Sequence, residues 1–465
     1  MNDTNRYLEE NQIIAITKKC INKTFGELGL SSLNKSNKGG LGGFIEENVF
    51  NYPSNSDENP DFINAGIELK VTPVRLNQDG TYSSKERLVL NMINYTSEVS
   101  KTFETSSFYR KNKRLLIWFY LYTKGLNPAD FKITNYDLFE FENSIQYKTI
   151  KRDWEIIHKK IFLGKAHEIS ESDTTFLAAC TKGANSTILT SQPNSSVLAK
   201  PRAYSFKCGF MTRLYRNLIH SVGPYVSFIS EDEWLKNPLE EVYKEKLKKY
   251  KGMSILELKH RFYLTSNAKD ITFRIAQKML GLEGNSTSTL EMADAGIKLK
   301  TVRLSKSGTP HESMSFPAFD FTELLTTKWE ESDIREDFVD WKLMLFIFKD
   351  DTSGICRFDK IIFWNIPNAI VDGPIKEMYG KCVDAVSTGN VIMDVSYDGT
   401  VKDYFPKESE KRGGNGVCHV RPHGRNSKDT FALPVPDKLT GRQEYTKQCF
   451  WFNKMFVKKI IDDAE

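Results

Sequence analysis

Three residues in the segment 60–70 have the types and spacing of a site that holds a divalent metal ion beside a phosphodiester. Asp61 is followed, after a six-residue gap, by Glu68 and Lys70. Apolar and polar residues alternate here, which predicts a strand with one apolar face. Glu68 and Lys70 then share the other face, roughly 7 Å apart at their Cα atoms. Gly66 suits a bend that brings Asp61 to the same face.

These residue types fit the chemistry of phosphodiester hydrolysis. Mg²⁺ prefers oxygen ligands and is usually held by one or two carboxylates, here Asp61 and Glu68. The ion would polarise a phosphoryl oxygen and acidify a water molecule. Lys70 would orient that water or offset the charge that develops in the transition state. The alternative interpretation is an exposed strand whose glutamate and lysine are only solvated.

The elements expected around this segment form a mixed α/β domain. A helical start leads into strands at about 64–75 and 86–95, and the turn signal Asp79-Gly80 between them favours a hairpin. A further strand is expected at 114–122, followed by helices and late strands.

Length and composition favour a soluble protein of several domains. The 465 residues suffice for two or three domains, and the chain is 40% hydrophobic and 27% charged. Lys and Arg exceed Asp and Glu by 65 to 60, so a nucleic-acid footprint must be a local patch. We expect no membrane span and no signal peptide. The seven cysteines contain no Cys-x-x-Cys pair, which predicts reduced thiols and a cytoplasmic protein.

The chain repeats itself once. Ala65–Lys70 has a near copy in Ala295–Lys300. Further pairs follow in the same order along the chain: Gly26–Gly29 with Gly281–Gly284, Leu115–Tyr122 with Leu343–Phe348, Thr181–Asn185 with Pro422–Asn426, and Tyr204–Phe210 with Phe450–Phe456. Several matches in one order indicate a duplicated domain.

The two copies differ where the metal site is expected. Lys298 takes the place of Glu68, and the position of Asp61 falls on Glu291. The second copy also lacks most of the stretch before the metal strand, which in the first copy is basic, glycine-rich and then helix-like. A cation held by two carboxylates does not tolerate a lysine in place of one of them. The second copy is therefore expected to be catalytically inactive.

The repeat predicts three parts. Residues 1–230 form the catalytic domain, residues 231–262 a charged helical linker region, and residues 263–465 the degenerate copy. The linker is expected because glutamate and lysine alternate there, as in a solvated helix.

The motifs resemble those of the MutH/Sau-type endonucleases, metal-dependent DNases of the Pro-Asp…(Asp/Glu)-x-Lys superfamily that act at GATC. The resemblance rests on Asp61, on Glu68-Leu69-Lys70, on Gly43-x-x-x-Glu47 and on Lys111 ahead of Arg114-Leu115-Leu116. It extends over nearly the whole chain through these blocks: Ser83–Leu90, Phe103–Phe108, Thr181–Asn185, Glu312–Phe316 and Phe363–Pro367. The implied fold is a restriction-endonuclease-like core, duplicated as two MutH-like domains.

The resemblance implies roles for the site residues. Asp61 and Glu68 become the metal carboxylates, Lys70 the catalytic lysine, and Lys111 an additional active-site lysine. Glu47 matches the family's helix glutamate near the metal, although the sequence does not decide between Glu47 and its neighbour, Glu46. The alternative for Glu47 is an exposed helix carboxylate, and for Lys111 a general attraction to phosphate.

DNA contacts are expected in a late loop of each copy. Lys182 falls on the family's DNA-reading loop, and lysine and asparagine, here Asn185, match guanine and adenine edges in the major groove. Mismatch-repair members carry Arg-Pro-Lys there, whereas this chain has Cys-Thr-Lys in the first copy and Arg-Pro-His in the second. The remaining candidates for contacts with DNA are Lys85, Arg87, Arg421, His423 and Arg425. Surface turns and solvated strand faces are the alternative.

The resemblance implies a Type II restriction endonuclease that hydrolyses both strands of DNA at 5′-GATC-3′ with Mg²⁺ and leaves 5′-phosphates. The second copy would bind DNA as an effector domain, and a cognate methyltransferase is an implied partner. One competent site facing a two-fold symmetric target predicts either dimerisation on DNA or two successive nicks, and we favour a monomer in solution that dimerises on DNA. The alternatives are a mismatch-repair enzyme that nicks one strand and a GATC-binding protein without activity.

Overall fold

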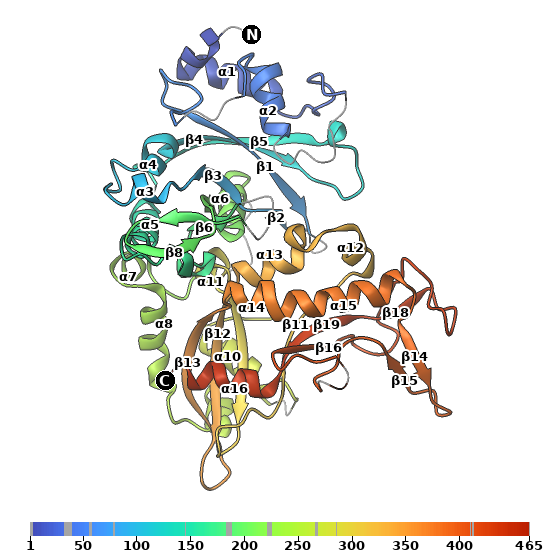
Figure 1. The fold of residues 1–465 in the computed structure, drawn as a ribbon. Coiled ribbons are helices and arrows are strands. Elements are labelled where there is room, and N and C mark those ends of the chain that lie inside the picture. Colours follow the sequence, from blue (N-terminus) through green and yellow to red (C-terminus); the bar gives the residue numbers. More distant parts are fainter. Residues whose placement is uncertain are drawn as a thin grey trace. The chain divides into compact units, whose positions relative to one another are not determined.

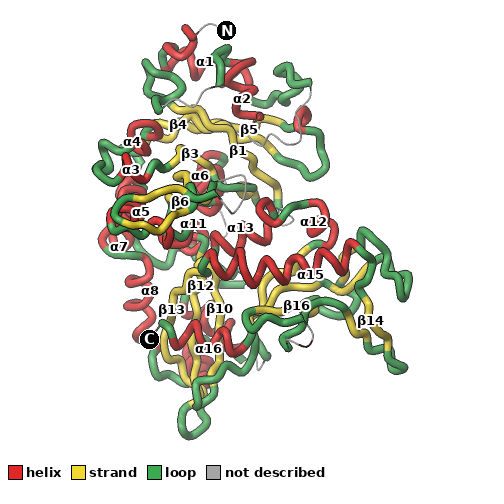
Figure 2. The backbone as a smooth tube through the Cα atoms, in the orientation of Figure 1, coloured by secondary structure: helices red, strands yellow, loops and turns green. Residues whose placement is uncertain are grey.

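The computed structural model describes residues 3–31, 40–54, 58–77, 80–144, 146–182, 188–220, 226–265, 268–284, 286–409, 411 and 413–464. They form two compact units of mixed α and β structure, as the sequence predicted (Figures 1 and 2). The first unit comprises Met1–Tyr225 with Leu290–Gly296, and the second comprises Val226–Thr289 with Ile297–Glu465.

A four-stranded sheet forms the centre of the first unit. Strand β1 (Glu68–Leu76) pairs in parallel with β4 (Arg114–Leu121) and antiparallel with β2 (Tyr82–Ser84). Strand β5 (Lys132–Glu140) completes the order β2-β1-β4-β5 by pairing antiparallel with β4. Five consecutive side chains of β4 are fully buried, so both faces of this strand are covered.

Helices cover the two faces of this sheet (Figure 1). Helices α1 (Glu10–Cys20) and α2 (Gly40–Phe44) contribute to the hydrophobic core on one face. On the other face, α6 (Cys208–Leu218) places the Tyr215 ring 5.1 Å from that of Phe119. Strand β1 is consequently buried on both sides, and any charge on it needs a partner.

A second sheet of the first unit has the order β3-β9-β6, with β3 at Leu88–Met92, β9 at Arg202–Phe206 and β6 at Leu177–Thr181. Helix α5 (Tyr147–Phe162) is tied to β6 because buried Asp153 accepts hydrogen bonds from the amides of residues 175–177. The other helices and strands of this unit are α3 (Tyr95–Glu98), α4 (Ser107–Asn112), β7 (Thr190–Gln192), β8 (Ser195–Ala199) and α11 (Leu290–Ala295), with a π-helical turn, η2 (Ile45–Val49).

The second unit contains two sheets with a corresponding strand order. Strand β10 (Ile297–Leu304) pairs in parallel with β12 (Lys342–Asp350), which pairs antiparallel with β13 (Cys356–Asn365). The other sheet has the order β11-β19-β16, with strands at Met314–Phe319, Gln448–Phe452 and Cys418–Pro422. The remaining elements are α7 (Glu231–Lys236), α8 (Leu239–Leu247), α9 (Ile255–Arg261), α10 (Ile271–Met279), α12 (Phe321–Thr326), α13 (Asp333–Asp340), α14 (Asn368–Ile370), α15 (Lys376–Ser387), α16 (Lys454–Asp462), and the hairpins β14–β15 (Ile392–Val395, Val401–Asp403) and β17–β18 (Thr430–Ala432, Glu444–Thr446).

The pairing registers of the two units also correspond. Glu68 of β1 lies opposite Leu115, and Lys298 of β10 lies opposite Leu343. Strands β3 and β11 each carry an irregularity at the same point of their pairing with the middle strand. Strand β6 ends opposite Arg202 in β9, as β16 ends opposite Gln448 in β19.

One expected strand is placed differently. The segment that pairs with β1 is Tyr82–Ser84, and the chain then leaves this sheet. The Ser84 hydroxyl donates to the Glu86 carbonyl at 2.8 Å, which turns the chain before β3 begins in the other sheet. The prediction of one strand over 86–95 is therefore wrong at both ends, and Asp79 of the expected turn lies outside the described residues.

The charged region expected as a linker, 231–262, forms helices of the second unit. Helix α8 buries Leu239, Val242, Tyr243 and Leu247, and Glu240 pairs with Lys342 of β12 at 2.6 Å. All seven cysteines lie among the described residues and are free thiols. No helix within the described ranges is long and apolar enough to cross a membrane.

Candidate active site

A tight hairpin ahead of β1 brings Asp61 back to the strand. Phe62 and Ile67 form an antiparallel bridge, and Gly66 at the turn has a φ of 62°, which a glycine adopts without strain. Two arginines hold the hairpin from outside. Arg6 donates to the Asp61 carbonyl at 3.3 Å, and Arg114 donates to the Ala65 carbonyl at 2.6 Å. The bend expected at Gly66 is confirmed.

The two carboxylates lie side by side across this hairpin. An Asp61 carboxylate oxygen accepts a hydrogen bond from the Leu69 amide at 2.9 Å, and Glu68 accepts one from the Asp61 amide at 3.2 Å. Asp61 is 6% exposed and Glu68 is 2% exposed. Each carboxylate is thus fixed to the other's backbone, and both are nearly removed from water.

Two lysines converge on Glu68. The Lys70 ammonium lies 2.6 Å from Glu68 Oε1, and the Lys111 ammonium lies 3.7 Å from the same oxygen. Lys111 belongs to the last turn of α4, immediately before β4, so the parallel pairing of β1 and β4 brings it to the site. The structure therefore gathers four of the five residues to which the sequence gave catalytic roles: Asp61, Glu68, Lys70 and Lys111.

The electrostatics of the cluster follow from this crowding. Burial and, to a smaller extent, the neighbouring Glu68 carboxylate raise the pKa of Asp61, and Lys70 opposes them, so that the pKa lies at about 7. Burial opposes the charge of Lys70, but Glu68 and Asp61 outweigh it and leave the Lys70 pKa above its ordinary value. The ionised form of Asp61 is thus disfavoured in this cluster, and a bound cation would stabilise it.

Glu46 is the helix glutamate that acts on this cluster. Its charge raises the pKa of both Asp61 and Lys70. The pKa of the buried Tyr52 hydroxyl is raised mainly by burial, next by Asp61 and then by Glu46. The Glu46 carboxylate is held by the Ser54 hydroxyl at 2.6 Å. The assignment of Glu47 remains a prediction, and the structure favours Glu46 in that role. Tyr52, fully buried beside the carboxylates, had no signal in the sequence.

The two glutamates provide a matched pair of variants. We expect Glu46→Ala to lower the cleavage rate about tenfold or more, because Glu46 adds to the negative charge that holds a cation, whereas Glu47→Ala changes it less than threefold. Single-turnover cleavage of duplex DNA measures both rates. The reverse order of the two effects would restore Glu47 as the site glutamate.

The residues predicted to contact DNA in the first unit have different surroundings. Lys182 is exposed at the end of β6, where its amide donates to the Pro201 carbonyl, and Asn185 lies outside the described residues. The Lys85 ammonium lies 4.8 Å from the centre of the Tyr122 ring. Arg87 forms an ion pair with buried Glu171, so it has a structural partner within the unit.

In the second unit two of the three candidates, Arg421 and His423, contact Trp451 of β19. The Arg421 guanidinium lies 3.7 Å from the centre of the Trp451 ring, and the His423 ring meets it edge-on at 5.4 Å. Burial lowers the pKa of His423, and Lys300 and Arg421 lower it further. The Arg425 side chain is 91% exposed and lies 3.5 Å from Asp429.

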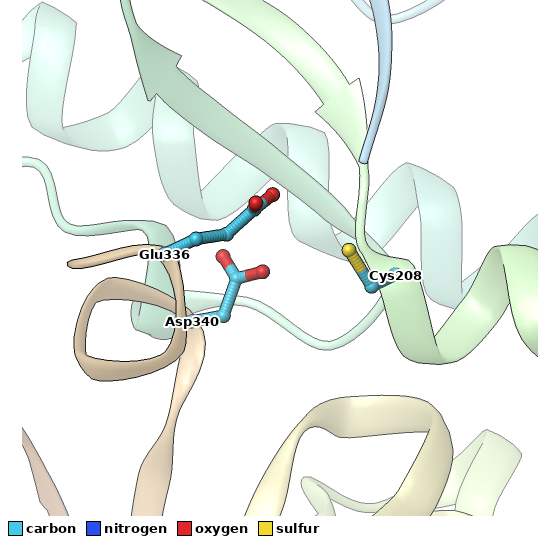
Figure 3. A group of neighbouring side chains, drawn as sticks. All are labelled: Cys208, Glu336 and Asp340. Atoms are coloured by element: carbon cyan, nitrogen blue, oxygen red, sulfur yellow. The ribbon is translucent and has the colours of Figure 1, made fainter. Parts of the chain in front are cut away.

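The acidic residues Glu336 and Asp340 lie one turn apart on α13 of the second unit, while Cys208 begins α6 in the first unit (Figure 3). Because these residues belong to different units, they provide no basis for a shared metal site. The carboxylates at the start of β1 are therefore the metal ligands that the described part of the chain supports best.

Comparisons with known proteins agree with this geometry. The family model described as DNA mismatch repair enzyme MutH matches residues 50–153 and 280–369, which contain the Asp61 cluster and the strand with Lys298. The chain is similar to the Type II restriction enzyme Sau3AI of Staphylococcus aureus, with 35% identity over 98% of this chain and 99% of that enzyme.

Shorter similarities reach the DNA mismatch repair protein MutH. Identity is 29% with the protein of Buchnera aphidicola, over 32% of this chain and 68% of that protein. It is 28% with the protein of Vibrio vulnificus, over 40% of this chain and 82% of that protein. The near-complete match to the restriction enzyme, together with the carboxylate and lysine cluster, shows that the chain belongs to the MutH/Sau-type restriction endonuclease family and is a site-specific deoxyribonuclease.

Proposed function

We propose that this enzyme hydrolyses both strands of duplex DNA at 5′-GATC-3′ in the presence of Mg²⁺, leaving 5′-phosphates and 3′-hydroxyls. The observation that carries the proposal is the convergence of Asp61, Glu68, Lys70 and Lys111 within one buried cluster. The sequence GATC follows from the resemblance of the motifs. The active site lies in the first unit.

The donor set fits a hard divalent cation. Asp61 and Glu68 present carboxylate oxygens next to one another, and burial and the Glu68 charge raise the pKa of Asp61, so a bound cation would stabilise its ionised form. These two residues would hold the ion, with Glu46 close enough to add to the field. When bound, Mg²⁺ supplies Lewis-acid polarisation of a phosphoryl oxygen and activation of water.

The two lysines carry the remaining chemistry. Lys70 is held by Glu68 and keeps its proton, so it is available to orient a water or to balance charge on the phosphate in the transition state. Lys111 approaches the same Glu68 oxygen from α4 and brings a second positive charge to the place where the phosphodiester would lie. The cluster has few exposed atoms, which strengthens each of these interactions relative to water.

We infer that the second unit is a degenerate copy of the first. The corresponding order of β1-β4-β5 and β10-β12-β13 and the equal registers at Glu68 and Lys298 support a duplication. Lys298 replaces a metal carboxylate with an ammonium, so this unit would bind DNA without cutting it and act as an effector domain. The three-part division at 1–230, 231–262 and 263–465 belongs to this proposal.

One competent site per chain also shapes the proposed partners. Duplex DNA with a two-fold symmetric GATC site presents two equivalent bonds, so we propose that the monomer pairs on DNA to cut both strands. A cognate methyltransferase would protect the host chromosome, and the cytoplasm would be the place of action. We propose no association with a membrane.

The direct test is to sequence the ends produced from a plasmid in the presence of Mg²⁺ and to compare unmethylated, hemimethylated and fully methylated GATC duplexes. Double-strand breaks at GATC with 5′-phosphate ends are expected. Nicking confined to the unmethylated strand would identify a mismatch-repair activity instead. Binding to GATC without any cutting would contradict the assignment as an Mg²⁺-dependent nuclease.

A variant of the second unit tests the division of labour. We expect Arg421→Ala to weaken DNA binding about tenfold, or to weaken the stimulation of the enzyme by a second GATC site to the same extent. The substitution removes a guanidinium that stacks on Trp451 at an exposed strand end. The single-turnover rate at saturating enzyme should stay within about twofold of the wild-type rate. If that rate collapses while the DNA remains fully bound, Arg421 takes part in the chemistry and the proposed division is wrong.

A further inference from the structure

The strand β10 of the second unit carries two lysines where β1 carries its Glu-x-Lys. Lys298 lies opposite Leu343 and Lys300 opposite Leu345, as Glu68 and Lys70 lie opposite Leu115 and Ile117. Residues two apart on a strand project from the same face. The strand positions that hold one carboxylate and one ammonium group in the first unit thus hold two ammonium groups in the second.

Aromatic rings and a backbone carbonyl position these ammonium groups. Lys298 is an exposed residue of the strand, and its ammonium lies 5.2 Å from the centre of the Trp341 ring. The Lys300 ammonium donates to the Ser315 carbonyl at 2.5 Å and lies 5.0 Å from the centre of the Phe316 ring. Lys300 therefore uses one of its three N–H donors on the Ser315 carbonyl.

Positive charge accumulates at this face. Burial and the charge of Lys298 lower the pKa of Lys300 against the opposing effect of Cys449, so that the pKa lies at about 8. Lys300 and Arg421 in turn lower the pKa of His423 at the end of β16. Lys298 therefore acts on Lys300, and Lys300 and Arg421 act on His423, so the four side chains lie close enough to interact electrostatically.

Asp337 of α13 is the carboxyl group that faces Lys298. The pKa of Asp337 lies at about 7, above its ordinary value, although the charge of Lys298 lowers it. No ion pair of Lys298 or Lys300 with a carboxylate occurs among the residues that the structure describes. The lysines are therefore not consumed by internal salt bridges, unlike Lys70 of the first unit at 2.6 Å from Glu68.

We propose that Lys298 and Lys300 form a metal-independent binding site for a backbone phosphate of duplex DNA, at the strand position where the first unit has Glu68 and Lys70. The phosphodiester anion binds at the strand position that corresponds to the metal site of the first unit, and the ammonium groups donate hydrogen bonds to its oxygens. Arg421 continues the positive surface toward the strand end. This proposal rests on the proposed DNA-binding role of the second unit.

The test measures DNA binding by the full-length protein in the presence of a chelator, which prevents metal-dependent cutting. We expect Lys298→Ala to weaken binding about tenfold and to lower the slope of log K against log salt by about one. The loss should be equal for duplexes with and without GATC, because a phosphate contact carries no sequence information. Lys298→Arg should restore most of the affinity.

Lys402→Ala is the matched control, because it removes the same charge from a lysine of the second unit that is 55% exposed and paired with Asp394. It should leave affinity and slope unchanged. Unchanged affinity and slope in Lys298→Ala would overturn the proposal, as would a loss confined to GATC duplexes. A failure of the wild-type protein to cleave with Mg²⁺ is a separate result that bears on the proposed function alone.

A second measurement separates DNA from free phosphate. The melting temperature is compared in inorganic phosphate and in chloride of equal ionic strength. If phosphate stabilises the wild type but not Lys298→Ala, while DNA binding is the same for both, the site takes free phosphate and the DNA assignment is wrong. A Lys298-dependent effect on DNA binding supports the proposal.

Discussion

Glu68→Ala is expected to lower the rate of DNA cleavage about a thousandfold while leaving the protein able to retard GATC duplexes. The side chain is 2% exposed and contacts Lys70, Lys111 and the Asp61 amide, so its removal deprives the site of a metal ligand and of the group that positions both lysines. Single-turnover cleavage with Mg²⁺ measures the rate, and gel retardation in chelator measures binding.

Two further variants show whether a loss of cleavage in Glu68→Ala comes from the missing carboxylate or from a packing defect. Glu68→Gln keeps the size of the side chain and should lose activity to a similar extent, which separates chemistry from a packing defect. Asp130→Ala removes an exposed carboxylate of the same unit and should leave the rate within about twofold. Near-normal cleavage by Glu68→Gln would show that the carboxylate is not a metal ligand.

The central part of the site could be predicted because it is local in sequence. The period-two pattern around Glu68 and Lys70 and the glycine at 66 determine a strand and a hairpin, and these features alone bring Asp61 to the carboxylate of Glu68. Lys111 comes from another element, and only the family resemblance indicated it. The position of Lys111 in the site depends on the parallel pairing of β1 with β4, which no local sequence pattern predicts.

The rest depended on backbone irregularities. Helix α2 continues into a π-helical turn, which shifts the side chains relative to an α-helix, so the sequence did not reveal which of Glu46 and Glu47 the structure would favour. The alternation around Lys85 and Arg87 suggested one strand, but the chain changes sheets there and Arg87 pairs with buried Glu171. Burial of both faces of β1 was also unforeseen, since charged residues usually mark an exposed face.

Lys70→Met is expected to separate catalysis from metal binding. It should increase the rise in melting temperature on adding Mg²⁺, whereas Glu68→Ala should decrease that rise. Cleavage should fall about a hundredfold with the loss of the ammonium group. In the protein without metal, however, Asp61 and Glu68 lose the cation that now lies 2.6 Å from Glu68 and lowers the pKa of Asp61. The melting temperature without Mg²⁺ should therefore drop, and the rise on adding Mg²⁺ should exceed that of the wild type.

Glu68→Ala should instead show a smaller rise with Mg²⁺ than the wild type, because a ligand is gone while Lys70 remains to compete for Asp61. Thermal unfolding of the three proteins with Mg²⁺ and with chelator, at pH 8 where Asp61 is mostly ionised, measures this difference. Opposite shifts in the two variants mean that Lys70 occupies part of the cation's electrostatic role in the resting enzyme. Equal losses of the Mg²⁺ response would mean that Lys70 is needed to shape the metal site, and its role as a separate catalytic group would be wrong.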